Sequence, residues 1–229
     1  MEPQFKAIAD HALLVTFADE ISEEAHASVL ALDAALAAQL PDGMIETVPA
    51  MVNLLVSFDL LITDHAAMET HVRGCLGAQV ARRPAGVTRK VQVCYEGPFS
   101  PDLAAVASAT GHTPEAVINA HLAGDFRVLM YGFAPGYAYL SGVPDAIQVP
   151  RKSTPLRDVP AGSVIIAGPQ CLITTLTMPT GWSIIGRSPT PIFTGNPDAP
   201  FLFDVGERVE FERIDAAAFE LLGKVKNHA

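Results

Sequence analysis

The sequence has little positive charge and few cysteines. Among its 229 residues, 15 are Lys or Arg and 25 are Asp or Glu, which gives a formal net charge of −10. This acidic balance argues against a chain that wraps nucleic acid or lies on an anionic membrane, because both surfaces attract a basic face. The three cysteines are an odd number without C-x-x-C spacing, so the sequence predicts neither a disulfide framework nor a cysteine-based zinc site.

Long apolar runs are missing as well. No stretch approaches the roughly 20 apolar residues that a membrane-spanning helix needs, and the run Leu54–Ile62 is interrupted by Ser57 and Asp59. Near the start, Glu2 and Asp10 stand where a secretory leader needs a basic flank followed by an unbroken apolar run. We therefore expect a cytoplasmic protein without a membrane segment.

The standard catalytic motifs are also absent. The sequence contains no P-loop (G-x-x-x-x-G-K-S/T), no nucleophile elbow (G-x-S-x-G), no H-E-x-x-H and no dinucleotide-binding G-x-G-x-x-G. ATP or acyl chemistry would therefore need a site without a standard signature. The seven histidines are scattered without the spacing of metal ligands, so the sequence predicts no metal site.

What is present is enough apolar sequence for a folded core, with 49% apolar and 17% charged residues. Residues 5–95 show the pattern β-α-β-β-α-β, and its two helices follow the capping residues Ser22 and Asp64. The last strand of the pattern is 87–95. This order is typical of the ferredoxin-like sandwich, and we assign it to a first domain of residues 1–88.

After Arg127 the sequence consists of short β-rich runs separated by glycine and proline, which favours a barrel or a sandwich. Two short helices precede these runs and share the pattern hydroxyl, proline, acid, beginning at Ser100 and Thr113. A boundary is expected at 82–86, where Arg, Pro and Gly gather. We assign residues 89–229 to a second, β-rich domain, so the predicted fold class is α+β.

The densest block of aromatic residues and glycines runs from Arg127 to Gly142. Aromatic side chains flank Pro135-Gly136, and the glycines permit turns and close approaches that other residues resist. One interpretation is the wall of a ligand pocket, and the alternative is a tight β-loop whose tyrosines cover the core. Under the first interpretation the substrate-binding residues of the block are Tyr131, Gly132, Pro135, Gly136 and Tyr139.

Two arginines and the only tryptophan form a second group of candidates. The planar guanidinium groups of Arg151 and Arg187 suit a carboxylate or a phosphate, and the alternative for each is a surface charge. On a regular strand Trp182 and Arg187 point to opposite faces, so they share a pocket only if the strand bends or ends at Gly186. The alternative for Trp182 is a core anchor.

One histidine is a candidate for proton transfer. His121 follows the start of a helix at Pro114, near the helix end where the dipole favours an imidazolium. It could act as a general acid or base, and the alternative is a structural histidine at a helix end.

Several blocks stand in a fixed order along the chain: Phe133–Gly142, Pro150-Arg151, Val159–Val164, Ala167–Gln170 and Gly181–Arg187. Together with Asp10–Val15 and Val91–Tyr95, these blocks resemble the B-subunit family of prokaryotic 5-oxoprolinase. The same family is labelled allophanate hydrolase subunit 1, or KipI-type sensor histidine kinase inhibitor. The resemblance spans nearly the whole chain.

The resemblance implies a ferredoxin-like domain followed by a cyclophilin-like β-barrel from about residue 90. It implies a chain that is inactive alone and forms a pocket with the C subunit, the pair being equivalent to the carboxyltransferase domain of urea carboxylase. With the A subunit, such a complex opens 5-oxoproline to glutamate using ATP, which the complex binds without a P-loop in this chain. On this basis we assign His121 and Arg187 as catalytic, and Arg151, Gln170 and Trp182 as further substrate-binding residues.

The sequence departs from the family pattern in one segment. Family members commonly have Y-P-L-E-S-P-G-G-W where this chain has T-T-L-T-M-P-T-G-W at Thr174–Trp182, so its substrate is 5-oxoproline, another lactam or amide, or none. The other interpretations are a KipI-type module that docks on a histidine kinase, and a carboxyltransferase subunit like those of allophanate hydrolase or urea carboxylase. The barrel alone would be the basis for a peptidyl-prolyl isomerase, and a fold does not imply a function.

Overall fold

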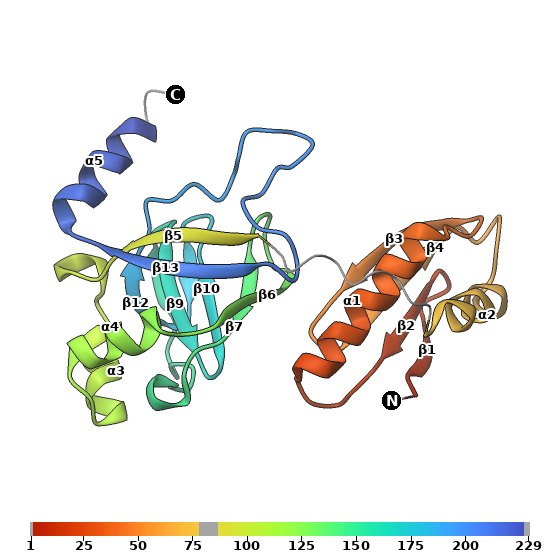
Figure 1. The fold of residues 1–229 in the computed structure, drawn as a ribbon, viewed down its shortest axis with the longest axis horizontal. Coiled ribbons are helices and arrows are strands. Elements are labelled where there is room, and N and C mark those ends of the chain that lie inside the picture. The colour runs from red at the N-terminus through yellow and green to blue at the C-terminus, as the bar shows by residue number, and fades with distance from the viewer. Residues whose placement is uncertain (1, 78–86, 227–229) are drawn as a thin grey trace. The chain divides into compact units, whose positions relative to one another are not determined.

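The computed structural model describes residues 2–77 and 87–226, and the chain divides into two compact units, residues 1–85 and 86–229. The boundary expected at 82–86 lies outside the described residues. The first unit contains, in chain order, β1 (Gln4–Ile8), β2 (Ala12–Thr16), α1 (Glu23–Ala38), β3 (Met44–Pro49), β4 (Asn53–Phe58) and α2 (His65–Cys75) (Figure 1).

The two helices of the first unit begin at the residues that local chemistry predicts. Ser22 Oγ accepts a hydrogen bond from the Ala25 N–H at 3.1 Å, and Asp64 Oδ1 accepts one from the Ala67 N–H at 2.8 Å. Each bond satisfies a backbone donor that has no partner inside its helix. The predicted N-caps of both helices are therefore confirmed.

Replacing Asp64 with alanine is expected to lower the free energy of unfolding by about 1 kcal/mol, because the Ala67 N–H loses its acceptor. Urea denaturation followed by circular dichroism measures this loss. Asp64→Ser is the matched control, since a serine hydroxyl can cap the same helix. Equal losses in the two variants would contradict a capping role for Asp64.

The sheet of the first unit has the strand order β1-β2-β4-β3, and all neighbouring strands are antiparallel. Buried side chains of α1 and α2, such as Leu36 and Val72, form one hydrophobic cluster with Val15 and Val56 of the sheet. Both helices therefore cover the same face of the sheet.

The predicted element order needs a correction at both ends of this unit. The opening extended piece is two strands, β1 and β2, which form a hairpin. The strand predicted at 87–95 is β5 (Thr88–Cys94), which pairs with strands of the second unit. In the sheet of the first unit β2 lies between β1 and β4, and the element order of this unit is ββαββα.

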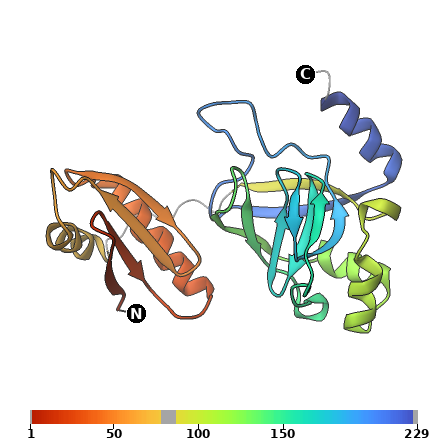
Figure 2. The ribbon, with the colours of Figure 1, turned by 180° about the vertical axis from the view of Figure 1, so that it is seen from behind.

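The second unit is a closed seven-stranded barrel with the strand order β10-β7-β6-β13-β5-β12-β9. Figure 2 shows it from the side of the cyan strands β9 and β10. Only β5 and β13 pair in parallel within this barrel. Its strands are β5, β6 (Phe126–Tyr131), β7 (Ala138–Ser141), β9 (Ser163–Ala167), β10 (Gln170–Ile173), β12 (Ser183–Arg187) and β13 (Arg208–Ile214). The closed barrel agrees with the β-barrel that the sequence and the family resemblance predict.

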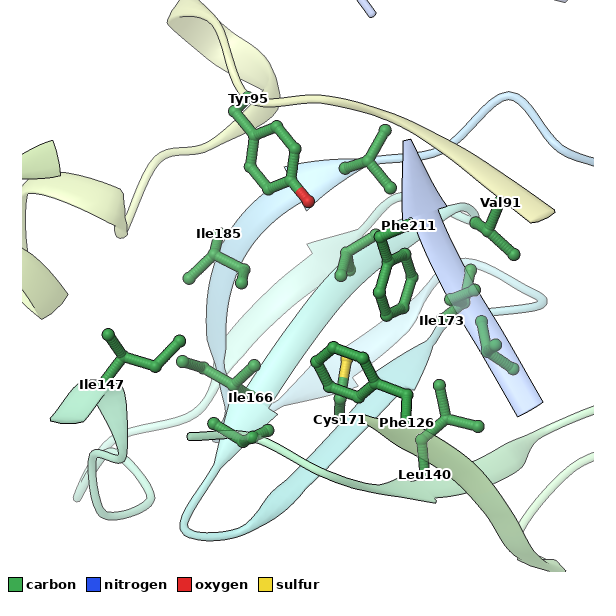
Figure 3. Close-up of a cluster of buried hydrophobic side chains, with 14 of the residues drawn as sticks. Val91, Tyr95, Phe126, Leu140, Ile147, Ile166, Cys171, Ile173, Ile185 and Phe211 are labelled. Carbon is green, nitrogen blue, oxygen red and sulfur yellow. The ribbon is translucent and has the colours of Figure 1, made fainter. Parts of the chain in front are cut away.

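The barrel interior is a packed core and not a pore. Phe126, Phe211, Cys171 and Ile166 point into it from different strands (Figure 3). Buried apolar side chains of α3 (Leu103–Thr110) and α4 (Pro114–Leu122) belong to the same cluster. A ligand site must therefore lie on the outside of the barrel or at its ends.

The remaining elements of the second unit lie around the barrel. The strands β8 (Leu156–Val159) and β11 (Met178–Thr180) pair with each other in a two-stranded sheet. The other elements are η1 (Gly97–Phe99), η2 (Asp145–Ile147) and α5 (Ala216–Lys226). Among the described residues, no helix is long and apolar enough to cross a bilayer.

The two helix starts predicted from a hydroxyl and a proline have different outcomes. Thr113 Oγ1 accepts from the Ala116 N–H at 3.2 Å and caps α4 as predicted. Ser100 does not cap α3, because the helix begins only at Leu103. The Ser100 hydroxyl donates a hydrogen bond to the Tyr95 carbonyl at 2.6 Å. Asp102 precedes α3 and its Oδ2 accepts the Ile184 N–H at 2.7 Å, so this acid ties the helix start to β12.

Candidate functional site

A cleft of about 220 Å³ in the second unit brings together three stretches of chain that are far apart in sequence. They are the turn before β9, the two residues that follow β10, and the segment that follows β12. The residues that line the cleft are Ala161, Gly162, Thr174, Thr175, Ser188, Thr190, Pro191, Ile192 and Phe193.

Backbone hydrogen bonds hold the three stretches together at Gly162. The Gly162 N–H donates to the Thr174 carbonyl at 2.7 Å, and the Ser188 N–H donates to the Gly162 carbonyl at 2.7 Å. Gly162 has a φ of +83°, and a Cβ on it would lie only 2.4 Å from the Ser188 oxygen. Only glycine permits both this conformation and this approach.

Hydroxyl groups line the cleft and divide into two kinds. Thr174 Oγ1 accepts the Ser163 N–H and donates to the Pro160 carbonyl, each at 2.9 Å, so it fixes the wall. Ser188 Oγ accepts the Thr190 N–H at 3.0 Å, and Thr190 Oγ1 accepts the Gln92 N–H at 3.1 Å. Within the described residues these two use their oxygens as acceptors, which leaves their O–H groups available as donors to a ligand.

Arg187 ends β12 at the edge of this cleft. Its Nε donates to the carbonyl of Ala161 at 3.2 Å, and its guanidinium carbon lies 5.7 Å from the centre of the Phe219 ring. No carboxylate among the described residues forms an ion pair with it. The guanidinium can therefore offer its terminal N–H groups to an anionic ligand beside the hydroxyls.

The tyrosine and glycine block forms a loop that packs on one wall of the cleft. Thr175 Oγ1 donates to the Pro135 carbonyl at 3.0 Å. Gly136 has a φ of +70°, and a Cβ on it would lie 3.3 Å from Ile192 Cγ2. The Gly132 N–H donates to the Tyr137 carbonyl at 3.2 Å and closes the loop. Pro135 and Gly136 thus support the cleft through their backbone.

Tyr131 anchors a neighbouring segment and does not line the cleft. Its hydroxyl donates to the Phe203 carbonyl at 2.5 Å, and its ring lies 5.3 Å from that of Phe201. Burial, with the nearby carboxylates of Asp204 and Glu207, raises the pKa of the Tyr131 phenol. The phenol therefore remains protonated and acts as a structural donor.

Three of the predicted residues form a separate aromatic group on the outside of the barrel. The Trp182 ring lies 6.2 Å from the Tyr139 ring, and the Arg151 guanidinium carbon lies 5.4 Å from the Trp182 ring centre. Trp182 is buried in a cluster with Ile165 and Leu172, which agrees with the core-anchor alternative. None of the three lines the cleft, so Trp182 and Arg187 are not brought together.

Gln170 is the remaining predicted substrate-binding residue. It begins β10 and pairs with Ala167 across the β9–β10 turn. It is not among the cleft-lining residues.

His121 lies inside the core, away from the cleft. Its Nδ1 is 2.8 Å from the Tyr95 hydroxyl, its Nε2 is 3.6 Å from Cys171 Sγ, and its ring packs 4.5 Å from that of Phe211. The residue has no exposed surface, and burial lowers the pKa of His121 from 6.5 to about 3. An imidazole that stays neutral and has no contact with solvent or with the cleft favours the structural role of His121 over the catalytic one.

Sequence reasoning missed several residues of the cleft. Ser188 and Thr190 lie in the run S-P-T-P directly after Arg187, and this run was the available signal. Phe133 begins the block Phe133–Gly142 but was given no role of its own; it does not line the cleft, and it is exposed with a φ of +72°. Side chains rarely adopt that conformation, and such strain concentrates at functional sites.

The described residues contain a second cavity and no cluster of potential metal ligands. The cavity, of about 460 Å³, lies in the first unit between Phe17, Leu32 and Cys75, and none of the predicted site residues lines it. No group of three His, Cys, Asp or Glu side chains within the described ranges could hold a metal ion.

Comparison with known proteins gives a consistent set of matches. Residues 3–203 match the family model described as the carboxyltransferase domain, subdomain C and D. The chain is 35% identical over 223 residues to the B subunit of 5-oxoprolinase from Bacillus subtilis (strain 168), and the match covers 92% of each chain. These matches confirm the family resemblance seen in the sequence.

Two solved structures extend the comparison to the fold. The crystal structure of TTHA0988 matches with a TM-score of 0.79 and 32% identity, over 90% of this chain and 40% of that one. This chain therefore spans less than half of TTHA0988. The urea carboxylase of Kluyveromyces lactis matches with a TM-score of 0.78 and 16% identity, over 96% of this chain and 22% of that one. At that identity the likeness is one of fold alone.

Proposed function

We propose, from the premise that the chain belongs to the family of the carboxyltransferase domain, subdomain C and D, that it acts as the B subunit of an ATP-dependent, 5-oxoprolinase-type complex. The complex hydrolyses a small lactam or amide that carries a carboxylate. The observation that carries this proposal is that Arg187 bonds to the carbonyl of Ala161, a residue of the same cleft that Ser188 and Thr190 line.

The chemistry of the reaction matches what this cleft offers. A lactam carbonyl is a poor electrophile, and phosphorylation of its oxygen makes it reactive toward water. The complex must therefore hold a carboxylate, a phosphate and a ring. Arg187 is suited to the carboxylate or the phosphate because its terminal N–H groups can bind two oxygens at once. The two O–H groups can orient a carbonyl or phosphoryl oxygen by donating hydrogen bonds.

The chain supplies only part of the site. A cleft of about 220 Å³ is smaller than the roughly 300 to 1,000 Å³ of typical ligand pockets, which favours a half-site that a partner completes. None of the cleft-lining residues is basic, Arg187 stands only at the edge of the cleft, and the sequence has no P-loop, so these residues do not fit ATP by themselves. ATP is assigned to the complex. The C subunit is the carboxyltransferase partner that completes the pocket, and the A subunit joins the pair for the ATP-dependent reaction.

The segment Thr174–Trp182, which departs from the family pattern, affects which substrate the cleft can accept. Thr174 and Thr175 begin the stretch that differs from the family pattern, and both line the cleft. The substrate is therefore tested as a class, with 5-oxoproline first and related lactams and carboxylated amides after it.

Replacing Arg187 with alanine is expected to lower kcat/KM of the reconstituted complex by about 10- to 100-fold, which is the cost of losing a hydrogen bond to a charged group. The fold of the chain should be unchanged, because Arg187 forms no ion pair within the described residues, and the complex should still form. The measurement is ATP-dependent release of glutamate from 5-oxoproline by the complex of all three proteins, with complex formation checked by gel filtration.

Arg157→Ala is the matched control, since Arg157 is exposed on β8 and does not line the cleft. Arg187→Lys keeps the charge without the planar fork and should recover part of the activity. An Arg187→Ala complex with unchanged kcat/KM would remove Arg187 from the site. A wild-type complex that forms but hydrolyses none of these compounds would contradict the proposed reaction.

A further inference from the structure

Most of the net negative charge of the chain lies in its first unit. Residues 1–77 contain 2 Lys or Arg and 12 Asp or Glu, whereas residues 78–229 contain 13 of each kind. Arg82 and Arg83 also belong to the first unit, residues 1–85, which therefore has a formal charge of −8, whereas the second unit, which carries the cleft, has a formal charge of −2. A surface of one sign attracts partners of the opposite sign.

An exposed apolar patch lies within this acidic unit. Leu61 is 95% exposed, and its neighbours Leu60 and Ile62 are exposed as well. Ile62 lies against the start of β3, since a Cβ on Gly43 would be 3.0 Å from Ile62 Cγ2. Ile45, 65% exposed, is two residues further along. We call these four residues the loop patch: Ile45, Leu60, Leu61 and Ile62.

The turn that carries the loop patch is held in one conformation. Asp59 Oδ1 accepts the Leu61 N–H at 2.8 Å, and the Asp59 carbonyl accepts the N–H groups of Ile62 and Thr63 at 3.1 and 3.0 Å. The Asp59 N–H donates to the Gly43 carbonyl at 2.8 Å and ties the turn to β3. A leucine on such a turn loses little backbone entropy when a partner covers it.

Acidic residues flank the patch on each segment that forms it. Asp42 and Glu46 lie on either side of Ile45 in the chain, and Asp59 and Asp64 lie on either side of Leu60–Ile62. An apolar centre with a polar rim is the usual arrangement of a protein interface, and here the neighbouring polar residues are acidic. A partner that covers this face must bring apolar side chains to the centre and Lys or Arg to the rim.

We infer that the loop patch is a second docking surface for the C subunit, in addition to the cleft that this partner completes, and that the part of the partner that covers the patch has an apolar centre surrounded by basic residues. This inference rests on the proposed function. The acidic rim argues for a basic partner and against a second copy of this chain, because two copies of the first unit would bring like charges together.

Replacing Leu61 with serine is expected to raise the Kd for the purified C subunit at least about tenfold, as expected when a central apolar contact is lost. Isothermal titration calorimetry with the full chain measures it. Ile21→Ser is the matched control: Ile21 is an exposed residue of the same unit that lies before α1, outside the loop patch.

The rim is tested separately with the double variant Asp42→Asn, Glu46→Gln. Added salt should weaken the wild-type complex, and this variant should bind more weakly at low salt and lose part of the salt dependence. Glu23→Gln, Glu24→Gln removes two charges from the first turn of α1 and should leave the affinity unchanged.

The outcomes separate this inference from the proposed function. A wild-type chain that does not bind the C subunit overturns both. A wild-type chain that binds while Leu61→Ser binds equally well overturns the docking surface alone. A fall in the melting temperature of the free Leu61→Ser chain, absent in Ile21→Ser, would show that the patch is covered within this chain and would also overturn the inference.

Discussion

Lowering the pH from 7 to 4 is expected to cost the protein about 3 kcal/mol of unfolding free energy through His121 alone. Burial lowers the pKa of this imidazole from 6.5 to about 3 in the folded chain. Below pH 6.5 the unfolded chain binds a proton that the folded chain does not bind, so stability falls as the pH falls. The loss is about 1.4 kcal/mol per pH unit and ends near pH 3, where the folded state is protonated as well.

The variant His121→Gln tests this expectation, because glutamine does not titrate and can still accept a hydrogen bond from Tyr95. Urea denaturation at pH 7 and pH 4, followed by the fluorescence of Trp182, reports on the second unit, which contains the only tryptophan. The variant should be less stable than the wild type at pH 7 and lose less between the two values.

His112→Gln is the matched control for acidification, since His112 is an exposed residue of the same unit. It should keep the full acid sensitivity of the wild type. If His121→Gln lost as much stability between pH 7 and pH 4 as the wild type, the sealed imidazole would not be the source of the acid sensitivity.

Replacing Gly162 with alanine is expected to lower the free energy of unfolding by about 3 kcal/mol or more. A side chain at positive φ costs roughly 1 to 3 kcal/mol, and the new Cβ would lie 2.4 Å from the Ser188 oxygen. The backbone after β12 must then move, which separates the walls of the cleft. Urea denaturation measures the loss of stability, and kcat/KM of the complex should fall with it.

Gly168→Ala separates the two causes of this effect. Gly168 also has a positive φ, of +53°, but a Cβ there would meet no atom within 4 Å. This control should show the conformational cost alone. Equal losses of stability in the two variants would contradict the close approach of Gly162 to Ser188.

The features that the sequence predicted correctly are those that depend on neighbouring residues. Ser22, Asp64 and Thr113 cap helices because each side chain bonds to an N–H three positions later. Most of the strands in the second unit were also visible as β-rich runs between glycines and prolines. Ser100 misled the prediction, because the helix begins only at Leu103 and the Ser100 hydroxyl donates to the Tyr95 carbonyl.

The pairing of distant strands could not be predicted in the same way. β5 follows α2 directly in the chain, yet its partner β13 lies about 120 residues further along. A strand that alternates apolar and polar residues carries no mark of which sheet it joins. The β-α-β-β-α-β pattern included this strand because it follows in chain order, whereas the structure pairs it with strands of the barrel.

The candidate site was predicted in part for the same reason. Arg187, Pro135 and Gly136 belong to blocks that the sequence singled out, and they lie in or beside the cleft. Ser188 and Thr190 were missed because their role depends on a crossing of three segments at Gly162. The residue types alone did not distinguish His121 of the core from a catalytic histidine.

The position of β13 sets the order in which the barrel can form. This strand lies between β5 and β6, and it is the last strand of the barrel to be synthesised. Until it emerges from the ribosome, both of those strands keep an unpaired edge, and such edges invite aggregation. The barrel therefore closes only after translation has passed residue 214, and a chain that stalls before β13 is a substrate for chaperones and proteases.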